Sequence, residues 1–143
     1  MHTSHAVTLD RSPDVVFAYL SDVRNEAAWR SSITGSRYVG ADGPKLGVTG
    51  ETDVEMGGRA LTMRWTISGF SPGDRFVAWV LDGDPWHGGG SYRVTPAQGG
   101  STVAARLDVR VRGVARLLEP VLWFAFRRGL RDDLARLATV LSE

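Results

Sequence analysis

The amino-acid sequence predicts an α+β fold, in which a strongly bent antiparallel sheet of about seven strands wraps around one long C-terminal helix. Apolar and polar residues alternate in short runs from about residue 30 to residue 112, as they do in strands with one buried face. From about residue 120 onwards the period becomes helical. Two short helical segments stand between the first strand and the other six. The predicted order is therefore strand, two helices, six strands and helix.

The composition indicates a single globular domain over residues 1–143, large enough to bury a core. Apolar residues make up 43% of the chain and charged residues 23%, which argues against disorder. No apolar run approaches the ~18 to 20 residues of a membrane-spanning helix, and no secretory signal is visible, so we expect a cytoplasmic protein. The formal net charge of +1 is too small to imply nucleic acid or an anionic membrane as a partner, so we expect no nucleic acid partner.

The N-terminal region carries clear helix signals. Alternation over residues 5–9 predicts a first strand. Ser12 can then cap a helix, Pro13 suits the first helical position because it has no N–H to leave unpaired, and Asp14 complements the positive helix end. A second short helix follows and carries the chain to Trp29.

Turn signals divide the strand region. Clusters of glycine, proline and aspartate mark turns at residues 40–44, 57–58, 71–74 and 96–100. Strands are predicted at residues 30–40, 47–56, 59–70, 75–81, 91–95 and 101–112. The stretch 82–90, which ends in three glycines, is predicted to be a mobile loop. Sequential hairpins then make an antiparallel meander.

The C-terminal helix is predicted from about residue 120 to residue 141. Pro120 lies inside the helical pattern and predicts a break there, because proline cannot donate a helix hydrogen bond. The apolar stripe of this helix consists of Trp123, Phe126, Leu130, Leu134, Leu137 and Leu141. Asp132 and Asp133 stand among arginines of the same helix, and we predict that both acids pair along it at i to i+4 spacing.

This packing predicts a cavity. A bent sheet cannot press its whole inner surface against one cylindrical helix, so space remains between the two. We expect the short helices near Trp29 to close one end of that space. Glycines are frequent in the predicted strands and turns, as sharp curvature requires.

Three segments resemble a known superfamily. The pattern Ser-Pro-x-x-Val-Phe-x-Tyr-Leu-Ser-Asp from residue 12, followed by Trp29, is similar to the N-terminal signature of the SRPBCC (START/major birch allergen-like) superfamily. So is Tyr-Arg-Val-Thr-Pro at residues 92–96 with the glycine turn and Thr-x-Val after it. The segment over residues 116–137 resembles the branch called polyketide cyclase/dehydrase type 2. The resemblance spans essentially the whole chain and implies a helix-grip fold with a hydrophobic cavity.

Few residues are candidates for chemistry. His87 lies beside Trp86 at the expected cavity mouth, and Tyr92 falls on a predicted inner face, so these two are the candidate acid/base groups. A solvated loop position explains His87 better than a catalytic role, and ordinary core packing explains Tyr92 better. Without cysteine, metal-ligand spacing or a nucleophile elbow, we predict no metal, no cofactor and no covalent nucleophile.

Aromatic and methionine side chains gather on the predicted inner faces. As ordinary core they need no ligand, but together they suit an apolar or aromatic molecule, with hydroxyl and indole N–H groups as sparse polar contacts. The predicted ligand-binding residues are Trp29, Met63, Trp65, Trp79, Trp86, Tyr92, Trp123, Phe126 and Leu130.

The leading functional prediction is an intracellular protein that binds a hydrophobic or aromatic small molecule, with lipids among the candidates. One alternative is an enzyme of the polyketide cyclase/dehydratase or isomerase type that uses the same cavity. Another is a partner-binding module, or a homodimer, that uses the apolar surface of residues 117–126. Buried ionisable groups in the cavity would favour the enzyme, whereas apolar groups with one or two hydroxyls would favour binding.

Overall fold

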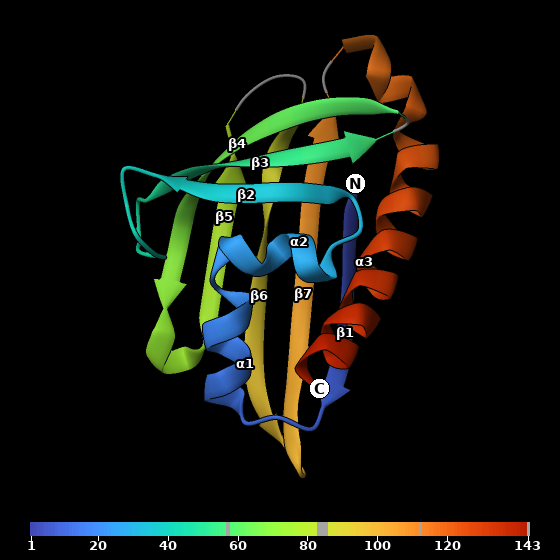
Figure 1. Cartoon of the computed structure of the whole chain (residues 1–143). Coiled ribbons are helices and arrows are strands. Elements are labelled where there is room, and N and C mark those ends of the chain that lie inside the picture. Colours follow the sequence, from blue (N-terminus) through green and yellow to red (C-terminus); the bar gives the residue numbers. More distant parts are fainter. Residues whose placement is uncertain (57, 83–85, 112, 143) are drawn as a thin grey trace.

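The computed structural model describes residues 1–56, 58–82, 86–111 and 113–142, and there the elements follow the predicted order (Figure 1). The strands are β1 (His2–Leu9), β2 (Ile33–Val39), β3 (Thr49–Met56), β4 (Arg59–Ser71), β5 (Phe76–Leu81), β6 (Trp86–Ala97) and β7 (Gly100–Val111). The α-helices are α1 (Pro13–Leu20), α2 (Glu26–Trp29) and α3 (Glu119–Leu141). Short 3-10 helices form η1 (Val23–Asn25), η2 (Pro72–Asp74) and η3 (Gly113–Leu118).

The strands form one antiparallel sheet in the order β1-β7-β6-β5-β4-β3-β2. The sheet bends strongly: β2 and β3 run almost across β6 and β7, while α3 lies alongside β1 (Figure 1). Register shifts between Ile33 and Gly35 and between Ile67 and Gly69 accompany the bend, as β-bulges do. The helix-grip fold predicted from the sequence is confirmed.

Local chemistry explains where the first helix begins. Ser12 has extended backbone geometry, and its hydroxyl accepts a 3.4 Å hydrogen bond from the N–H of Val15, so it is the predicted N-cap. Pro13 occupies the first turn, where its missing N–H leaves nothing unpaired. Val16 and Leu20 are buried on the face that α1 turns to the sheet.

The long helix packs against β1 and α2. Its buried stripe includes Leu130, Leu134, Leu137 and Leu141. The predicted break is confirmed, because η3 ends just before α3 and Pro120 lies in the first turn of α3.

The predicted loop over residues 82–90 is wrong from residue 86 onwards, where β6 begins; residues 83–85 lie outside the described part of the chain. The three glycines belong to the strand because neighbouring main chain leaves no room for side chains. A Cβ on Gly89 would lie 2.1 Å from the carbonyl oxygen of Trp79, and one on Gly88 would lie 2.1 Å from that of Asp108. The glycines therefore mark close main-chain approach in a paired strand.

Two tryptophans each pair across the sheet with a glycine. Gly50 of β3 lies opposite Trp65 of β4, and Gly90 of β6 lies opposite Trp79 of β5. A Cβ on Gly50 would lie 2.2 Å from Trp65 Cζ2, and one on Gly90 would lie 2.7 Å from Trp79 Cζ2. Each indole thus occupies the space that a side chain on its partner strand would need.

Replacing Gly50 by alanine should lower the free energy of unfolding by about 1–3 kcal/mol, because the new methyl group overlaps both Trp65 and the carbonyl oxygen of Arg37. Gly35→Ala is the matched control, since the nearest atom to a Cβ there is 3.9 Å away. We expect this control to change stability by less than about 1 kcal/mol. Urea denaturation of both variants measures the difference, and equal stabilities would contradict the steric argument.

Candidate functional site

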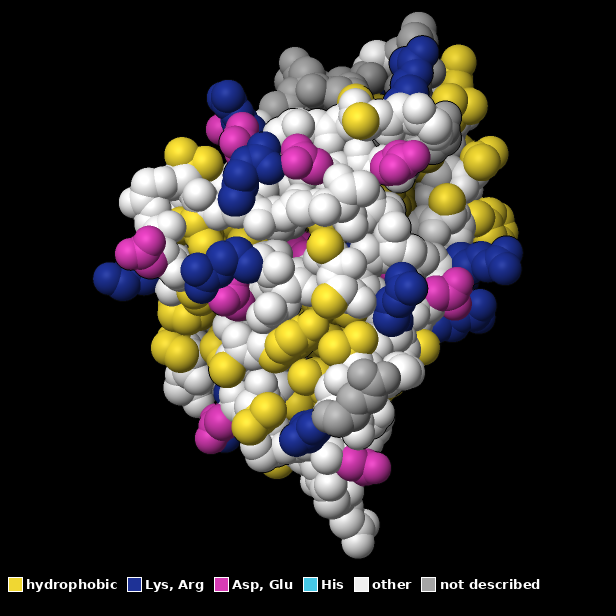
Figure 2. All heavy atoms as spheres, in the orientation of Figure 1, with side chains coloured by type: hydrophobic (Ala, Val, Ile, Leu, Met, Phe, Trp, Pro, Cys, Tyr) yellow, Lys and Arg dark blue, Asp and Glu magenta, His cyan; other side chains and the backbone are white. Residues whose placement is uncertain are grey.

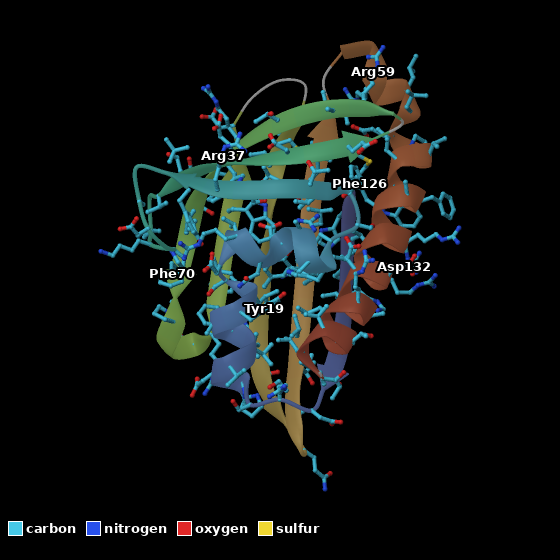
Figure 3. All side chains as sticks on the ribbon, in the orientation of Figure 1. Tyr19, Arg37, Arg59, Phe70, Phe126 and Asp132 are labelled. Carbon is cyan, nitrogen blue, oxygen red and sulfur yellow. The ribbon has the colours of Figure 1, made fainter. Side chains whose placement is uncertain are left out.

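A cavity of about 310 Å³ lies between the curved sheet, the short helices and α3. Every strand except β1 contributes to its wall. Its apolar lining comes from Leu20, Val23, Ile33, Val54, Met63, Trp65, Ile67, Val77, Trp79, Leu81, Leu107, Val109, Ala125, Phe126 and Leu130. Phe126 lies on the side of α3 that faces the sheet (Figure 3).

Two indoles and a phenol form the aromatic part of this wall. The N–H of Trp65 donates a 2.8 Å hydrogen bond to the Thr52 hydroxyl, so the polar group of this buried indole is satisfied within the protein. The Trp79 ring lies 4.9 Å from the Tyr92 ring, centroid to centroid. With its polar edge occupied, Trp65 presents apolar surface to the cavity.

Three ionisable side chains meet where α2 approaches α3. The guanidinium of Arg30, just after α2, places Nη1 3.2 Å from Glu26 Oε2 and Nε 3.8 Å from Asp133 Oδ2. The side chains of Glu26 and Asp133 are only 11% and 6% exposed. Buried charges lose their hydration and persist only when they are paired, so these three groups depend on one another.

The prediction that Asp133 pairs along α3 is wrong. Ser31 donates two hydrogen bonds to Asp133 Oδ1, one from its backbone N–H and one from its hydroxyl, each 3.1 Å long. Asp133 therefore ties α3 to the connection between α2 and β2. The prediction for Asp132 is confirmed, because it lies 3.9 Å from Arg128 on the outer side of the helix (Figure 3).

Burial shifts the proton affinities of this cluster. It raises the pKa of Glu26, and the charge and hydrogen bond of Arg30 offset only part of the shift. Burial likewise raises the pKa of Tyr92, against the opposing charge of Arg30. For Arg30, burial lowers the pKa, but the negative forms of Tyr92, Glu26 and Asp133 outweigh it and the net shift is upward. At neutral pH the cavity therefore has a guanidinium cation beside a neutral phenol that can donate a hydrogen bond.

Two buried N–H groups near the cluster have no hydrogen-bond partner within the described part of the chain: Trp29 Nε1 and Arg30 Nε. The Arg30 guanidinium carbon lies 5.9 Å from the centre of the Trp29 ring. A buried donor without an acceptor costs about 1–3 kcal/mol and is uncommon. Arg30 lines the cavity, so its Nε–H is one of these unpaired donors at the polar end of the cavity.

The structure brings together most of the residues that the sequence predicts for ligand binding. Those that line the cavity are Met63, Trp65, Trp79, Tyr92, Phe126 and Leu130. Trp29 is fully buried behind the wall, with its ring edge-on to Tyr92 at 5.8 Å. Trp123 does not line the cavity, because its indole N–H donates a 2.8 Å hydrogen bond to the carbonyl oxygen of His2. The side chain of Trp86 lies outside the described structure.

His87, the other candidate acid/base residue, does not line the cavity. It pairs in register with Arg110 of β7, which is exposed, whereas the neighbouring pair contains buried Val109. His87 therefore belongs to the outer face of the sheet. Of the two predicted acid/base candidates, only Tyr92 lines the cavity.

The charged members of the site are not among the predicted residues. Glu26 and Arg30 are four residues apart, a spacing that brings side chains together on a helix. Asp133 stands three residues after Leu130 and four before Leu137, within the buried stripe of α3. A carboxylate in an apolar stripe needs a partner, so the position of Asp133 in the sequence could have predicted a buried ion pair.

Among the described residues, no three His, Asp or Glu side chains cluster closely enough to hold a metal ion. None of the helices in the described ranges has the length and apolar character needed to cross a bilayer.

These features define a helix-grip protein with an internal cavity that is largely apolar and polar at one end. The chain belongs to the family described as polyketide cyclase / dehydrase and lipid transport, whose model matches residues 1–142. The predicted superfamily and branch are thereby confirmed. A search of curated proteins finds no match.

Solved structures share the fold at low sequence identity. The Thermus thermophilus protein TTHA0849 is 10% identical with a TM-score of 0.83, covering 97% of this chain and 95% of its own. The Zhui aromatase/cyclase from Streptomyces is 16% identical with a TM-score of 0.78, covering 97% and 92%. A START superfamily protein from Mycobacterium smegmatis is 16% identical with a TM-score of 0.70, covering 94% and 98%.

Asp133→Ala should lower the free energy of unfolding by about 3 kcal/mol or more, because it removes the acceptor of both Ser31 hydrogen bonds and one carboxylate beside Arg30. Asp132→Ala is the matched control, since that side chain is 60% exposed on the same helix. The control should change stability by less than about 1 kcal/mol. Chemical denaturation compares the two, and similar losses would contradict a special role for Asp133.

Glu26→Gln should gain stability relative to the wild type as the pH rises. The pKa of Glu26 is raised in the folded state above its ordinary value of 4.5, so between those two values the folded chain binds more protons than the unfolded chain. This group therefore stabilises the fold at low pH and loses that contribution as pH rises through its folded pKa. Urea denaturation of both proteins from pH 5 to pH 8 measures the difference, in which titrating groups remote from Glu26 cancel. If the stability of Glu26→Gln instead falls relative to the wild type as the pH rises, the upward shift is contradicted.

Proposed function

We propose that this chain binds a compact, mainly apolar or aromatic small molecule in the cavity, with an oxygen atom of the ligand directed toward Arg30 and Tyr92. The observation that carries the proposal is the cavity of about 310 Å³, with aromatic and aliphatic walls and one polar end. Pockets for apolar ligands commonly combine apolar walls with a few polar groups that fix orientation.

The size of the cavity limits the ligand. Small-molecule pockets span roughly 300–1,000 Å³, so this one lies at the lower end of the range. The indoles of Trp65 and Trp79 are held against glycine positions of the adjacent strands. We therefore expect a ligand of about two fused rings, or an aliphatic molecule of similar volume.

The charges of the polar end favour an uncharged ligand over a carboxylate. Glu26 and Asp133 supply two acidic groups against the single guanidinium of Arg30. A ligand carboxylate would add a further negative charge to this poorly hydrated environment. A carbonyl or hydroxyl oxygen could accept a hydrogen bond from Arg30 or Tyr92 without that cost.

An enzyme of the cyclase/dehydratase type is the second candidate, favoured by the convergence of Glu26, Arg30 and Tyr92 on the cavity. In an aldol cyclisation a carboxylate removes a proton from the carbon beside a ketone. The enolate carbon then attacks a second carbonyl, and the resulting alkoxide takes up a proton. The new carbon–carbon bond closes the ring, and loss of water from the β-hydroxy ketone then forms a carbon–carbon double bond. Glu26 could exchange the protons, while Arg30 and Tyr92 stabilise negative charge on oxygen.

The two candidates are separated by turnover. A solved protein with this fold is an aromatase/cyclase, so a linear poly-β-ketone is a reasonable test substrate. Conversion by the wild type that is lost in Glu26→Gln and Tyr92→Phe would establish the enzyme. Ligand binding without conversion would favour the binding protein.

Ligand binding itself is tested with defined compounds. Native mass spectrometry of freshly purified protein identifies any molecule that co-purifies. 2-Naphthol, a neutral two-ring phenol, should raise the melting temperature by mass action, and 2-naphthoate, its carboxylate counterpart, should raise it less. If nothing co-purifies and a broad panel of aromatics and lipids leaves the melting temperature unchanged, the proposal is wrong.

Gly129→Leu should weaken 2-naphthol binding at least about tenfold by filling the cavity. Gly129 lines the cavity and a Cβ there meets no atom within 4 Å, so a side chain can begin without a clash, and leucine also favours the helix. Ala135→Leu, on an exposed position of α3, is the control and should leave affinity unchanged. Fluorescence titration measures both, and undiminished binding by Gly129→Leu would place the ligand elsewhere.

A further inference from the structure

Four exposed apolar side chains lie close together in sequence on η3 and the first turns of α3. This surface, the apical patch, consists of Leu117, Leu118, Val121 and Phe124, which are 85%, 57%, 69% and 68% exposed. Single exposed apolar residues are ordinary on proteins, but a continuous group of them commonly marks an interaction site.

The apical patch has no role in holding α3 to the sheet. At about 100° per residue, Val121 projects from the side of the helix opposite the buried Leu130 and Leu137, and Phe124 points about 120° or more away from both. Figure 2 shows hydrophobic side chains along the upper turns of α3 at the right edge of the molecule. The helix is thus apolar on two opposite sides at its N-terminal end, and only one side is covered.

Trp123 borders the patch. Its indole N–H donates to the carbonyl oxygen of His2 at 2.8 Å, and its ring lies edge-on to Phe124 with 5.1 Å between centroids. The guanidinium carbon of Arg127 lies 5.2 Å from the Trp123 ring centre. An apolar ring with a satisfied polar edge and a neighbouring cation suits the boundary between lipid and water.

Arginines flank the patch in the sequence, one before it and three after it. Residues 113–132 contain four arginines against two acids, a local charge of +2: Arg116, Arg127, Arg128 and Arg131 against Glu119 and Asp132. Arg59 lies at the same end of the molecule (Figure 3). The chain as a whole has a formal net charge of +1, so this segment carries more net positive charge than the whole chain does.

We propose that the apical patch docks onto a membrane surface that contains anionic lipids. Figure 1 shows η3 extending beyond the end of the sheet. Leu117 and Leu118, which are exposed on η3, would therefore be among the first side chains to contact a membrane at this end of the molecule. Apolar side chains on such a helix enter the headgroup region of a bilayer, while arginines beside them pair with anionic headgroups. A second copy of this chain fits less well, because a symmetric contact would bring the two sets of arginines together.

Docking at this surface would place the cavity beside the bilayer. Ala125, Phe126 and Gly129 line the cavity from the turns of α3 that directly follow the patch. The membrane contact itself does not require the proposed ligand, so each proposal can fail without the other.

The test measures co-sedimentation of the full chain with vesicles of phosphatidylcholine alone and of a roughly 7:3 mixture with anionic phosphatidylglycerol. We expect binding to the mixed vesicles that decreases with added salt, and much weaker binding to the neutral ones. The double variant Leu117→Ser, Val121→Ser should reduce the vesicle partition coefficient at least about tenfold. Leu46→Ser, at a 67% exposed leucine before β3, is the matched control and should bind like the wild type.

The charge contribution has its own pair of variants. Arg128→Gln should weaken vesicle binding about fivefold, because it removes a positive charge next to the patch. Arg64→Gln should leave binding unchanged. The two positions are matched, since each arginine is well exposed and paired with one acid. Equal binding to neutral and mixed vesicles, or equal losses in patch and control variants, would overturn the proposal. So would a wild-type dimer in light scattering that the double serine variant makes monomeric, because the patch would then join two copies.

Discussion

The position of α3 depends on the buried contact between Asp133 and the segment that follows α2. Apolar packing along β1 has no strong directional preference. The two hydrogen bonds from Ser31 and the charge of Arg30, in contrast, fix the rotation of α3 about its axis and its distance from the segment after α2. Burying these charges costs hydration, which pairing offsets only when the geometry is good. The same side chains form the polar end of the cavity, so one interaction sets the place of the helix and the chemistry of the site.

The rest of the cavity follows from the bend of the sheet. Because β2 and β3 turn across the other strands, a single helix covers only part of the concave face. Indoles from β4 and β5 cover the remainder and give an aromatic wall around a small volume. The cavity does not collapse, because strand pairing holds its walls in place and the ion cluster holds its polar end.

The fold could be predicted from the sequence because its signals are local. Strand alternation, the cap at Ser12 and the stripe of α3 each depend on neighbouring residues, and the structure contains all three. The polar end of the site could not be derived in this way, since Ser31 and Asp133 are 102 residues apart in sequence. The glycines of residues 88–90 suggested mobility, but their spacing to neighbouring carbonyl oxygens shows that strand pairing determines their conformation.

The pairing of each indole with a glycine has an evolutionary consequence. A side chain added at Gly50 or Gly90 would displace the ring opposite it, so this wall cannot be altered gradually by single substitutions at those glycines. Positions such as Met63, Ala125 and Gly129 also line the cavity, and a Cβ at Gly129 meets open space. Selection for a different ligand would therefore act first through residues of α3 and the middle of β4. The two tryptophan–glycine pairs would stay unchanged in the cavity wall.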